Sequence, residues 1–476
     1  MIIEEIISQN ASSHPEKAAL ICGDITISYS DLWYKICNAA AYFSSLTEKG
    51  DRVILSASKS PDFVYCYFGA HLAGCICVPI DSETNVIRLE RIVSQAKPKI
   101  ILGELRNNVT YKVDAFPVFD NRKHDRVSFP AETDIADLLF TTGTTGLPKG
   151  VELSFKNQMA AANNINTFIG NTSDDTELLA LPISHSFGLG RLRCVLVKGA
   201  TLVLLGSFAS MKKFYAEIER CHITGFGMVP ASWAYIQKMS GDRIGNYSDQ
   251  IKYIEIGSAF MPLENKRKLM ELLPHTHICM HYGLTEASRS AFISFHDDTE
   301  YLNTMGKPAP NTDIDVFGEN GMKVSDGEEG ELCVKGDHVC SGYWGQTIES
   351  FGADFIDGYF KTGDWGFKDK SGYINMISRK KEIINVGGKK VSPIEVEEVL
   401  NQYPGITESA CVGVHDDVLG EVVKAFVTGS TTTADDILIK KELMRCLENY
   451  KVPAYIEHID EIPKTQNGKI QRLKLK

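Results

Sequence analysis

Short apolar runs alternate with helical stretches through the first half of the chain. Residues 31–46 repeat apolar side chains at helical spacing, and residues 63–73 show a second helical pattern. Between and beyond them, short apolar runs bounded by turn residues predict buried strands. This alternation favours a layered α/β architecture with mostly parallel sheets. The predicted strands span residues 52–55, 75–78, 99–102, 178–181, 201–205 and 253–256.

The pattern changes twice in the second half. Residues 306–336 combine short strands with dense turn residues, which favours a small antiparallel or barrel-like β region. After Arg379 the chain reads as a compact α+β unit, in which Thr433 and Asp436 form a predicted capping box. We therefore predict a large N-terminal domain of layered α/β subdomains over residues 1–379 and a small domain over residues 380–476. The predicted elements of the small domain are helices at 391–400 and 437–447 and strands at 409–414 and 422–427.

Composition excludes several classes of protein. The 476 residues are too many for one hydrophobic core, and a net charge of −11 argues against a nucleic-acid partner. The 12 cysteines are scattered without paired C-x-x-C blocks, so neither a disulfide framework nor a zinc site is expected. The N-terminus has no signal-peptide pattern, and no apolar stretch is long enough to span a bilayer. We expect a soluble cytoplasmic protein with no integral membrane segment.

The most informative segment is a loop rich in glycine and threonine at residues 138–150. An apolar strand leads into three glycines, four threonines and one lysine. Glycines let backbone N–H groups approach phosphate oxygens, hydroxyls donate to them, and a lysine offsets their charge. The spacing is not that of a Walker loop, and the alternative is a flexible surface turn. The predicted phosphate-binding residues are Thr141, Thr142, Gly143, Thr144, Thr145, Gly146 and Lys149.

This loop is similar to the signature of the adenylate-forming superfamily, which contains acyl-CoA synthetases, aryl-CoA ligases, adenylation domains and luciferases. Four further segments resemble the other signatures of that family, in the family's order. The resemblance implies an ATP-dependent enzyme whose small C-terminal domain is mobile and carries a catalytic lysine. The four segments are residues 281–286, 359–364, 378–397 and 463–470.

Two of these segments imply contacts to ATP and magnesium. In residues 281–286, Tyr282 would lie against the adenine, Thr285 would contact the α-phosphate and Glu286 would hold Mg²⁺. An aromatic face suits a base, and a carboxylate suits a hard cation that bridges phosphates. In residues 359–364, Asp364 would accept hydrogen bonds from the ribose hydroxyls.

The last two segments imply a hinge, a thiol channel and a catalytic group. Arg379 would touch ribose or phosphate, and Lys381 would mark the hinge about which the small domain rotates between two arrangements. Gly387 and Gly388 would leave room for a pantetheine arm. Lys469 would bridge the attacking carboxylate and the phosphate in the closed state. The alternative for this basic region is a solvated turn.

Two less specific resemblances imply where the acid substrate binds. In residues 181–188, His185 would border the acyl pocket, and Gly283 would line it. The strand-end turn Gly257-Ser258-Ala259 would lie beside adenine and substrate. The chain departs from the common family pattern at three positions, which bear on the shape of the pocket and on the thiol step. These positions are Met280, Phe260 and Asn385.

The resemblance implies a two-step reaction. The carboxylate of a small-molecule acid attacks the α-phosphate of Mg·ATP, pyrophosphate leaves, and the acyl group passes to the thiol of coenzyme A. One alternative is a stand-alone adenylation enzyme that loads the phosphopantetheine arm of an acyl carrier protein. Two others are a nucleotide-binding regulator without turnover and a luciferase-like oxygenase.

The identity of the acid is open at the level of sequence. The default is a small, medium-chain (fatty) or aryl acid. A dicarboxylic acid is the alternative, because one of four arginines near the predicted pocket could pair a second carboxylate. Against this, the arginines could simply be exposed on helices. They are Arg191, Arg193, Arg267 and Arg289.

Overall fold

A computed structural model describes residues 1–105, 111–119, 128–142, 148–464 and 469–475. The chain divides into two compact units. The first consists of Met1–Leu302, Gly306–Asp313 and Val334–Phe360, and the second of Asn303–Met305, Ile314–Cys333 and Lys361–Lys476. The mixed α/β fold, with a large N-terminal and a smaller C-terminal part, agrees with the predicted fold class. The predicted domain boundary after Arg379 stays a prediction.

A nine-stranded sheet forms the centre of the first unit, in the order β14-β13-β12-β11-β10-β8-β9-β1-β2. The pairs from β1 to β12 along this path are parallel, as predicted, and only its two ends are antiparallel. The strands are β1 (Ala18–Cys22), β2 (Ile25–Ser28), β8 (Thr176–Leu179), β9 (Thr201–Leu204), β10 (Gly225–Met228), β11 (Tyr253–Ile256), β12 (His277–Tyr282), β13 (Ala291–Ser294) and β14 (Lys307–Pro308).

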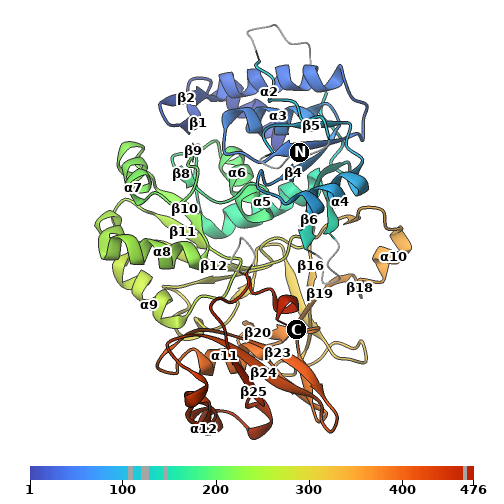
Figure 1. The fold of residues 1–476 in the computed structure, drawn as a ribbon. Coiled ribbons are helices and arrows are strands. Elements are labelled where there is room, and N and C mark those ends of the chain that lie inside the picture. Colours follow the sequence, from blue (N-terminus) through green and yellow to red (C-terminus); the bar gives the residue numbers. More distant parts are fainter. Residues whose placement is uncertain (106–110, 120–127, 143–147, 465–468, 476) are drawn as a thin grey trace. The chain divides into compact units, whose positions relative to one another are not determined.

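Helices cover both faces of this sheet (Figure 1). On one face, apolar side chains of α7, α8 and α9 pack against alternate residues of β8 to β12 in one core. On the other, α6 packs with β8, β9 and the N-terminal helices in a second core. The helices are α1 (Ile3–Ser13), α2 (Tyr29–Ser44), α3 (Pro61–Leu72), α5 (Phe155–Ile169), α6 (Ser186–Val197), α7 (Met211–Arg220), α8 (Pro230–Ser240) and α9 (Leu263–Leu272).

The predicted phosphate loop belongs to a second sheet, in the order β17-β7-β6-β4-β3-β5. Its strands β6 and β7 form an antiparallel hairpin that pairs Thr141 with Lys149. The loop is therefore the tip of a hairpin, and its residues 143–147 lie outside the described residues. The elements are β3 (Arg52–Ser56), β4 (Ile76–Ile80), β5 (Ile100–Leu102), β6 (Ile135–Thr142), β7 (Pro148–Ser154), β17 (Gly342–Tyr343), α4 (Val86–Ala96) and α10 (Ile348–Gly352).

A third sheet follows the order β15-β16-β19-β18, with β20 on β19. Of its strands, only β15 and β16 lie in the region 306–336, where short strands with dense turns were predicted. The β18–β19 and β19–β20 pairs, further along the chain, are antiparallel. The strands are β15 (Asp313–Phe317), β16 (Gly330–Lys335), β18 (Phe355–Ile356), β19 (Tyr359–Lys368) and β20 (Ile374–Arg379).

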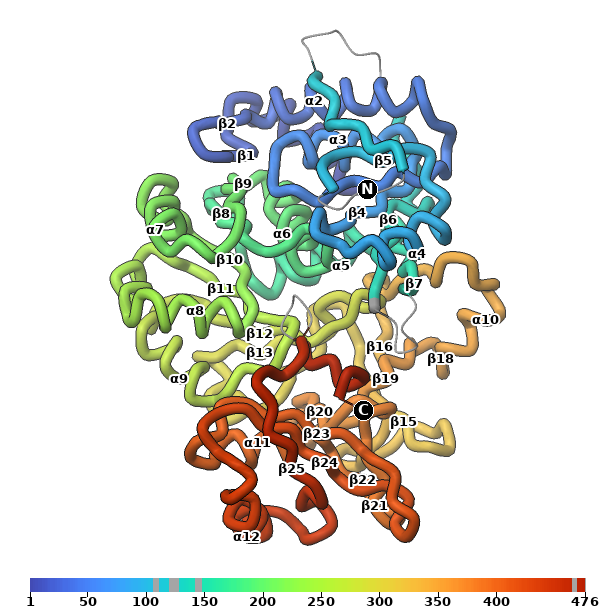
Figure 2. The backbone as a smooth tube through the Cα atoms, viewed as in Figure 1, coloured from blue at the N-terminus to red at the C-terminus, as the bar shows by residue number. Residues whose placement is uncertain are grey.

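The C-terminal elements form the predicted α+β arrangement (Figure 2). The capping box, however, uses Thr432 and Asp435, one residue before the predicted pair, because a short 3-10 turn precedes the second helix. The elements are β21 (Ile384–Val386), β22 (Lys389–Val391), α11 (Pro393–Leu400), β23 (Ile406–Asp416), β24 (Gly420–Gly429), α12 (Asp436–Cys446) and β25 (Tyr455–His458).

All 12 cysteines have free thiols, and nine of them are buried, which fits the prediction that they serve as small apolar residues. Among the described residues, none of the helices combines the length and the apolar character that a bilayer span requires.

Candidate active site

Three predicted site segments follow parallel strands of the nine-stranded sheet. His185 follows β8, the Gly257-Ser258-Ala259 turn follows β11, and residues 282–286 begin at the end of β12. Because β8, β10, β11 and β12 are parallel neighbours, these segments share the carboxyl edge of the sheet. Open α/β sheets bind their ligands at this edge.

Two glycines at this edge are required by close packing. A side chain at Gly257 would collide with the imidazole of His281 on the neighbouring strand, and one at Gly283 would collide with the backbone nitrogen of Arg289. Ser258 adopts a left-handed backbone with φ of +74°, which is uncommon for a residue other than glycine. Packing within the protein therefore accounts for both glycines, and their place beside adenine and substrate stays a prediction.

Tyr343 connects the phosphate hairpin to the second signature. Its hydroxyl donates a 2.9 Å hydrogen bond to Glu286 Oε1, and the Lys149 ammonium lies 5.0 Å from the centre of its ring. Burial and the nearby Glu286 carboxylate raise the pKa of the Tyr343 phenol, so it remains a donor at neutral pH. Lys149, Tyr343 and Glu286 therefore form one group within the first unit.

Tyr343 was missed by sequence reasoning. It lies in the two-residue strand β17, which pairs with β7 so that Tyr343 stands opposite Val151. The local sequence offered a weak signal only, a Gly-Tyr-Trp run after a turn-rich segment. What makes it a site residue is its partner in the fold, 57 positions away in sequence.

Behind this edge lies a buried network of charges centred on Glu255 of β11. Arg289 Nε donates to Glu255 Oε1 at 3.0 Å, Arg191 Nη1 donates to Oε2 at 3.2 Å, and His281 Nδ1 lies 2.6 Å from Oε1. Burial opposes the charge of Glu255, but Arg289, His281 and Arg191 outweigh it and lower the pKa of that carboxyl well below its usual range. Arg191 also pairs with Glu177.

Three of the four arginines near the predicted pocket are buried, contrary to the expectation that they are exposed on helices. Arg191, Arg193 and Arg289 are buried, and each pairs with an internal carboxylate. Arg267 is exposed on α9, as expected. The sequence could not show this, because the paired acids lie on distant strands.

In the second unit, the predicted ribose and phosphate residues lie together. Asp364 on β19 stands opposite Arg379 on β20, and Arg379 Nε lies 2.8 Å from Asp364 Oδ1. Asp364 is fully buried, while Arg379 is about one-third exposed. A carboxylate held by a guanidinium in this way has a defined orientation.

The predicted hinge and channel residues occupy turns of the second unit. Lys381 is exposed between β20 and β21, in a turn closed by a bond from Glu382 N to Arg379 O. Gly387 and Gly388 form the two-residue turn of the β21–β22 hairpin, with φ of +58° and +81°. A turn with two positive φ values favours glycine at both positions because of its backbone conformation alone. A side chain at Gly388 would meet no other atom.

Lys469 is exposed and follows residues 465–468, which lie outside the described residues. The chain before and after this segment is joined by a bridge between Lys464 and Ile470 and by a bond from Gln471 N to Pro463 O. The predicted catalytic lysine thus immediately precedes a residue that pairs with Lys464.

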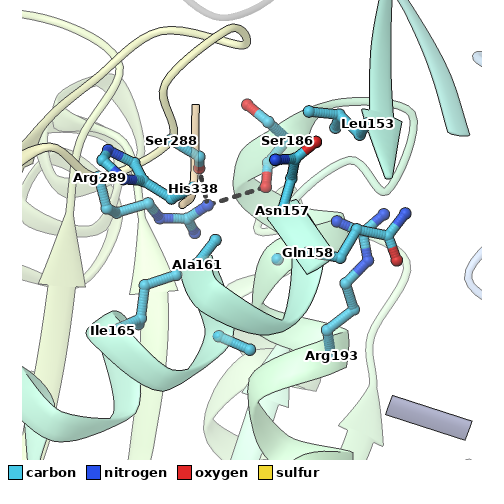
Figure 3. Close-up of a pocket in the computed structure, with 12 residues that line it drawn as sticks. Leu153, Asn157, Gln158, Ala161, Ile165, Ser186, Arg193, Ser288, Arg289 and His338 are labelled. Atoms are coloured by element: carbon cyan, nitrogen blue, oxygen red, sulfur yellow. Dashed lines mark hydrogen bonds between the residues drawn. The ribbon is translucent and has the colours of Figure 1, made fainter. Parts of the chain in front are cut away.

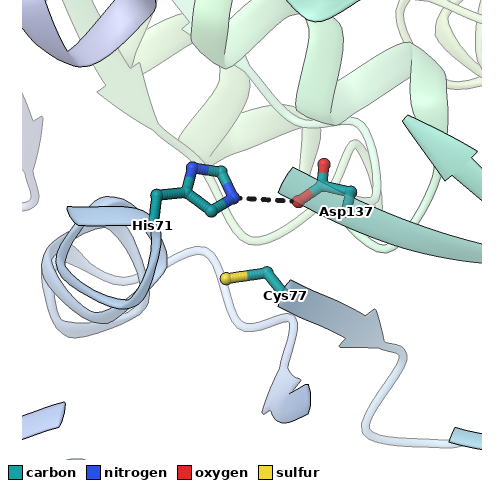
Figure 4. A group of neighbouring side chains, drawn as sticks. All are labelled: His71, Cys77 and Asp137. Atoms are coloured by element: carbon teal, nitrogen blue, oxygen red, sulfur yellow. Dashed lines mark hydrogen bonds and ion pairs between the residues drawn. The ribbon is translucent and has the colours of Figure 1, made fainter. Parts of the chain in front are cut away.

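A group of metal-type ligands includes none of the predicted site residues. His71, Cys77 and Asp137 are buried with their ligand atoms close together (Figure 4). His71 bonds to Asp137 at 3.1 Å and to Glu4 at 2.7 Å, and Arg193 pairs with Asp137. Burial opposes charge on the His71 imidazole, but the acidic groups of Cys77, Asp137 and Glu4 raise its pKa well above the usual range. Two cations then balance two carboxylates, so the cluster needs no metal ion to balance its charge.

The chain matches known protein families and a characterised enzyme over most of its length. Residues 7–344 match the model of the AMP-binding enzyme family, and residues 395–469 match that of the AMP-binding enzyme C-terminal domain. The chain is 30% identical to the long-chain-fatty-acid–CoA ligase of Bacillus subtilis, over 99% of this chain and 94% of that protein.

Solved structures of similar proteins share the fold of this chain. The o-succinylbenzoate CoA synthetase MenE of B. subtilis, in complex with its acyl-adenylate intermediate, superposes with a TM-score of 0.89 at 26% identity, over 99% of this chain and 97% of that one. ATP-bound MatB of Rhodopseudomonas palustris superposes with a TM-score of 0.88 at 25% identity, over 100% and 98% of the two chains.

The fold and the strand-end site define a nucleotide-dependent enzyme of the adenylate-forming class. The chain belongs to the AMP-binding enzyme family. The predicted enzyme class, an AMP-forming acid–thiol ligase, is thereby confirmed, and a small-molecule acid as substrate is supported.

Proposed function

We propose that the protein activates a small carboxylic acid as its acyl-adenylate, with release of pyrophosphate from ATP, and transfers the acyl group to coenzyme A. The observation that carries this proposal is the convergence on Tyr343. A cation from the phosphate hairpin and a carboxylate from the second signature meet on one side chain. Lys149 offsets phosphate charge, and Glu286 supplies an anionic ligand beside it.

Glu286 fits the magnesium ion that such a reaction uses. Tyr343 occupies Oε1, and within the described part of the chain Oε2 makes no hydrogen bond, so one carboxylate oxygen is available to a hard cation. Magnesium at this carboxylate would neutralise charge on the phosphates. The MenE enzyme of B. subtilis has been solved with ATP and magnesium.

The remaining roles follow the predicted assignments. Asp364, oriented by Arg379, accepts hydrogen bonds from the ribose diol. Tyr282, at the end of β12, lies against adenine, with Gly257, Ser258 and Ala259 on the other strand end. Thr285 and Lys469 donate to the charge that develops at the α-phosphate, where alignment and neutralisation supply most of the acceleration.

The deciding experiment measures pyrophosphate release from Mg·ATP over a panel of carboxylic acids, each with and without coenzyme A. Acid-dependent release that accelerates with coenzyme A and yields an acyl-CoA supports the proposal. A single turnover that coenzyme A does not accelerate would point to a carrier-protein thiol as acceptor. Tight ATP binding with no release for any acid would contradict the proposal and favour a regulator.

A further inference from the structure

The side chain of Arg289 contacts the start of helix α6, which directly follows His185 (Figure 3). Its Nη1 donates a hydrogen bond to the backbone oxygen of Ser186 at 2.8 Å, and its Nη2 donates to that of Phe187 at 2.9 Å. Because both nitrogens belong to one planar fork, the two bonds fix the position and the direction of the chain at this point. The guanidinium thus holds the segment that is predicted to border the acyl pocket.

Helix α6 is shaped to receive this guanidinium. The Cβ of a side chain at Gly190, one turn into the helix, would lie 2.6 Å from Nη1, and the guanidinium carbon lies 4.8 Å from the centre of the Phe187 ring. Nη1 also donates to Ser288 Oγ at 3.0 Å, so with the bond to Glu255 four of the five N–H groups are used. Arg289 is therefore held by the protein itself and has little capacity left for a ligand.

The Nε of the same guanidinium joins α6 to the central sheet. It donates to Glu255 Oε1 at 3.0 Å, and Glu255 lies on β11 two residues before Gly257. The Nδ1 of His281 on β12 lies 2.6 Å from the same oxygen, and the imidazole packs where a side chain at Gly257 would lie. The bond therefore fixes α6 relative to the strand ends that are predicted to border adenine and substrate.

The backbone of Arg289 lies against the loop that carries Thr285 and Glu286. Its nitrogen would be 2.4 Å from the Cβ of a side chain at Gly283, so the two chain segments are in direct contact. Arg289 adopts a left-handed backbone with φ of +56°, which is uncommon for a residue other than glycine. Residues in such conformations persist where the surrounding structure fixes them, and they cluster at functional sites. Arg289 thus contacts the loop through its backbone and α6 through its side chain.

We propose that Arg289 is a positioning residue that sets the distance between the acid and the nucleotide, because it fixes the segment at His185 against the loop that carries Thr285 and Glu286. This inference rests on the proposed function. Attack on the α-phosphate requires the two reacting atoms to be held about 3–3.5 Å apart. Loss of Arg289 should therefore impair the alignment of the two ligands and leave the binding of each one alone nearly unchanged.

The test uses Arg289→Met and Arg289→Lys. In both variants Glu255 keeps Arg191 and His281 as partners, so the buried carboxylate stays compensated and the fold should be retained. Lysine keeps the positive charge but lacks the planar fork, so it should not restore the alignment. Arg267→Met, at an exposed arginine on α9, is the control.

The two ligands are AMP and the N-acylsulfamoyl adenosine of the best acid in the panel, a stable mimic of the acyl-adenylate that occupies both sites at once. In both Arg289 variants we expect the Kd of the mimic to rise at least roughly tenfold and that of AMP to change less than about twofold, because only a linked ligand senses the distance between its two sites. The kcat for pyrophosphate release should fall by roughly ten- to hundredfold, with the KM for ATP nearly unchanged.

Titration calorimetry also gives the fraction of protein that binds, so misfolded protein lowers the stoichiometry and cannot imitate a selective loss of affinity. Equal weakening of AMP and the mimic, unaltered binding of the mimic, or full activity in Arg289→Lys would overturn the inference and leave the proposed function intact. A wild type that binds AMP and releases no pyrophosphate with any acid would overturn both.

Discussion

The phenol of Tyr343 donates to Glu286 Oε1 at 2.9 Å, while its ring faces the ammonium of Lys149. One side chain thus holds the orientation of the predicted metal-binding carboxylate and contacts the cation of the phosphate hairpin. The hydrogen bond joins a neutral donor to an ionised acceptor, which makes it stronger than a bond between neutral groups.

Tyr343→Phe should therefore weaken catalysis while it keeps the ring beside Lys149. Loss of a hydrogen bond to a charged group costs about 1.5–3 kcal/mol, or roughly ten- to hundredfold in rate. We expect kcat for pyrophosphate release to fall by this factor and the magnesium concentration for half-maximal activity to rise. Tyr247→Phe removes a phenol that donates to Glu219 on the surface and serves as the control. Equal activity of both variants would contradict the role of Tyr343.

Lys469→Ala should separate the two half-reactions. We expect adenylate formation to fall by roughly 10²–10³-fold, because a group that stabilises developing charge is removed. Thioester formation from a preformed acyl-adenylate and coenzyme A should be nearly unaffected. Lys474→Ala, which changes another exposed lysine of the same segment, is the control. If Lys469→Ala forms adenylate at the wild-type rate, the assignment is wrong.

Gly388→Asn distinguishes a turn glycine from a channel glycine. Asparagine tolerates the left-handed backbone that Gly388 adopts at φ of +81°, so the fold should be retained. If the position also borders the pantetheine arm, the thiol step should slow at least tenfold while adenylation stays intact. Gly372→Asn tests the same change in another open turn, at φ of +84°. Normal thioester formation in Gly388→Asn would restrict this glycine to its turn.

Asp137→Asn should destabilise the first unit strongly, because it leaves Arg193 and protonated His71 buried without their shared anion. Breaking such a buried pair costs about 3–5 kcal/mol, whereas Asp242→Asn at an exposed surface pair with Lys268 should change the stability little. Thermal and denaturant unfolding measure both. Because the charges balance without a metal, a chelator should not shift the melting temperature of the wild type; a shift would show that the cluster binds an ion.

Lys266 predicts a pH dependence of stability. Burial lowers the pKa of its ammonium from 10.5 to about 8. Such a base contributes stability above its unfolded pKa that is lost as the pH falls through its folded pKa. Its contribution to the free energy of unfolding should therefore rise by up to about 3 kcal/mol from pH 8 to 10.5.

Lys266→Met should abolish this rise. The difference in the free energy of unfolding between wild type and variant should therefore change from pH 8 to 10.5 and stay constant below pH 8. Denaturant titrations at several pH values measure this difference. Lys268→Met on the same helix is the control, since the hydrogen bond to Asp242 raises the pKa of Lys268 and should not produce the rise. A constant difference for Lys266→Met would contradict the prediction.

Much of the fold was predictable because its signals are local. The parallel strands β10 to β12 and the C-terminal α+β elements follow from short apolar runs and helical periodicity. One error was local as well: the capping box lies one residue earlier than predicted, because the helix is preceded by a 3-10 turn. The roles of all the predicted site residues stay predictions, including those of Lys381, Lys469 and the loop at 143–147.

The sequence by itself determined the family, the order of the signatures and the candidate nucleotide residues, since each signature is a contiguous run whose glycines and polar residues shape one loop. Only the tertiary structure decided which charges remain available to a ligand. Arg191 and Arg193 reach carboxylates 64 and 56 positions away. Such pairings depend on which strands become neighbours, and long-range packing decides that, so spacing along the chain cannot reveal them.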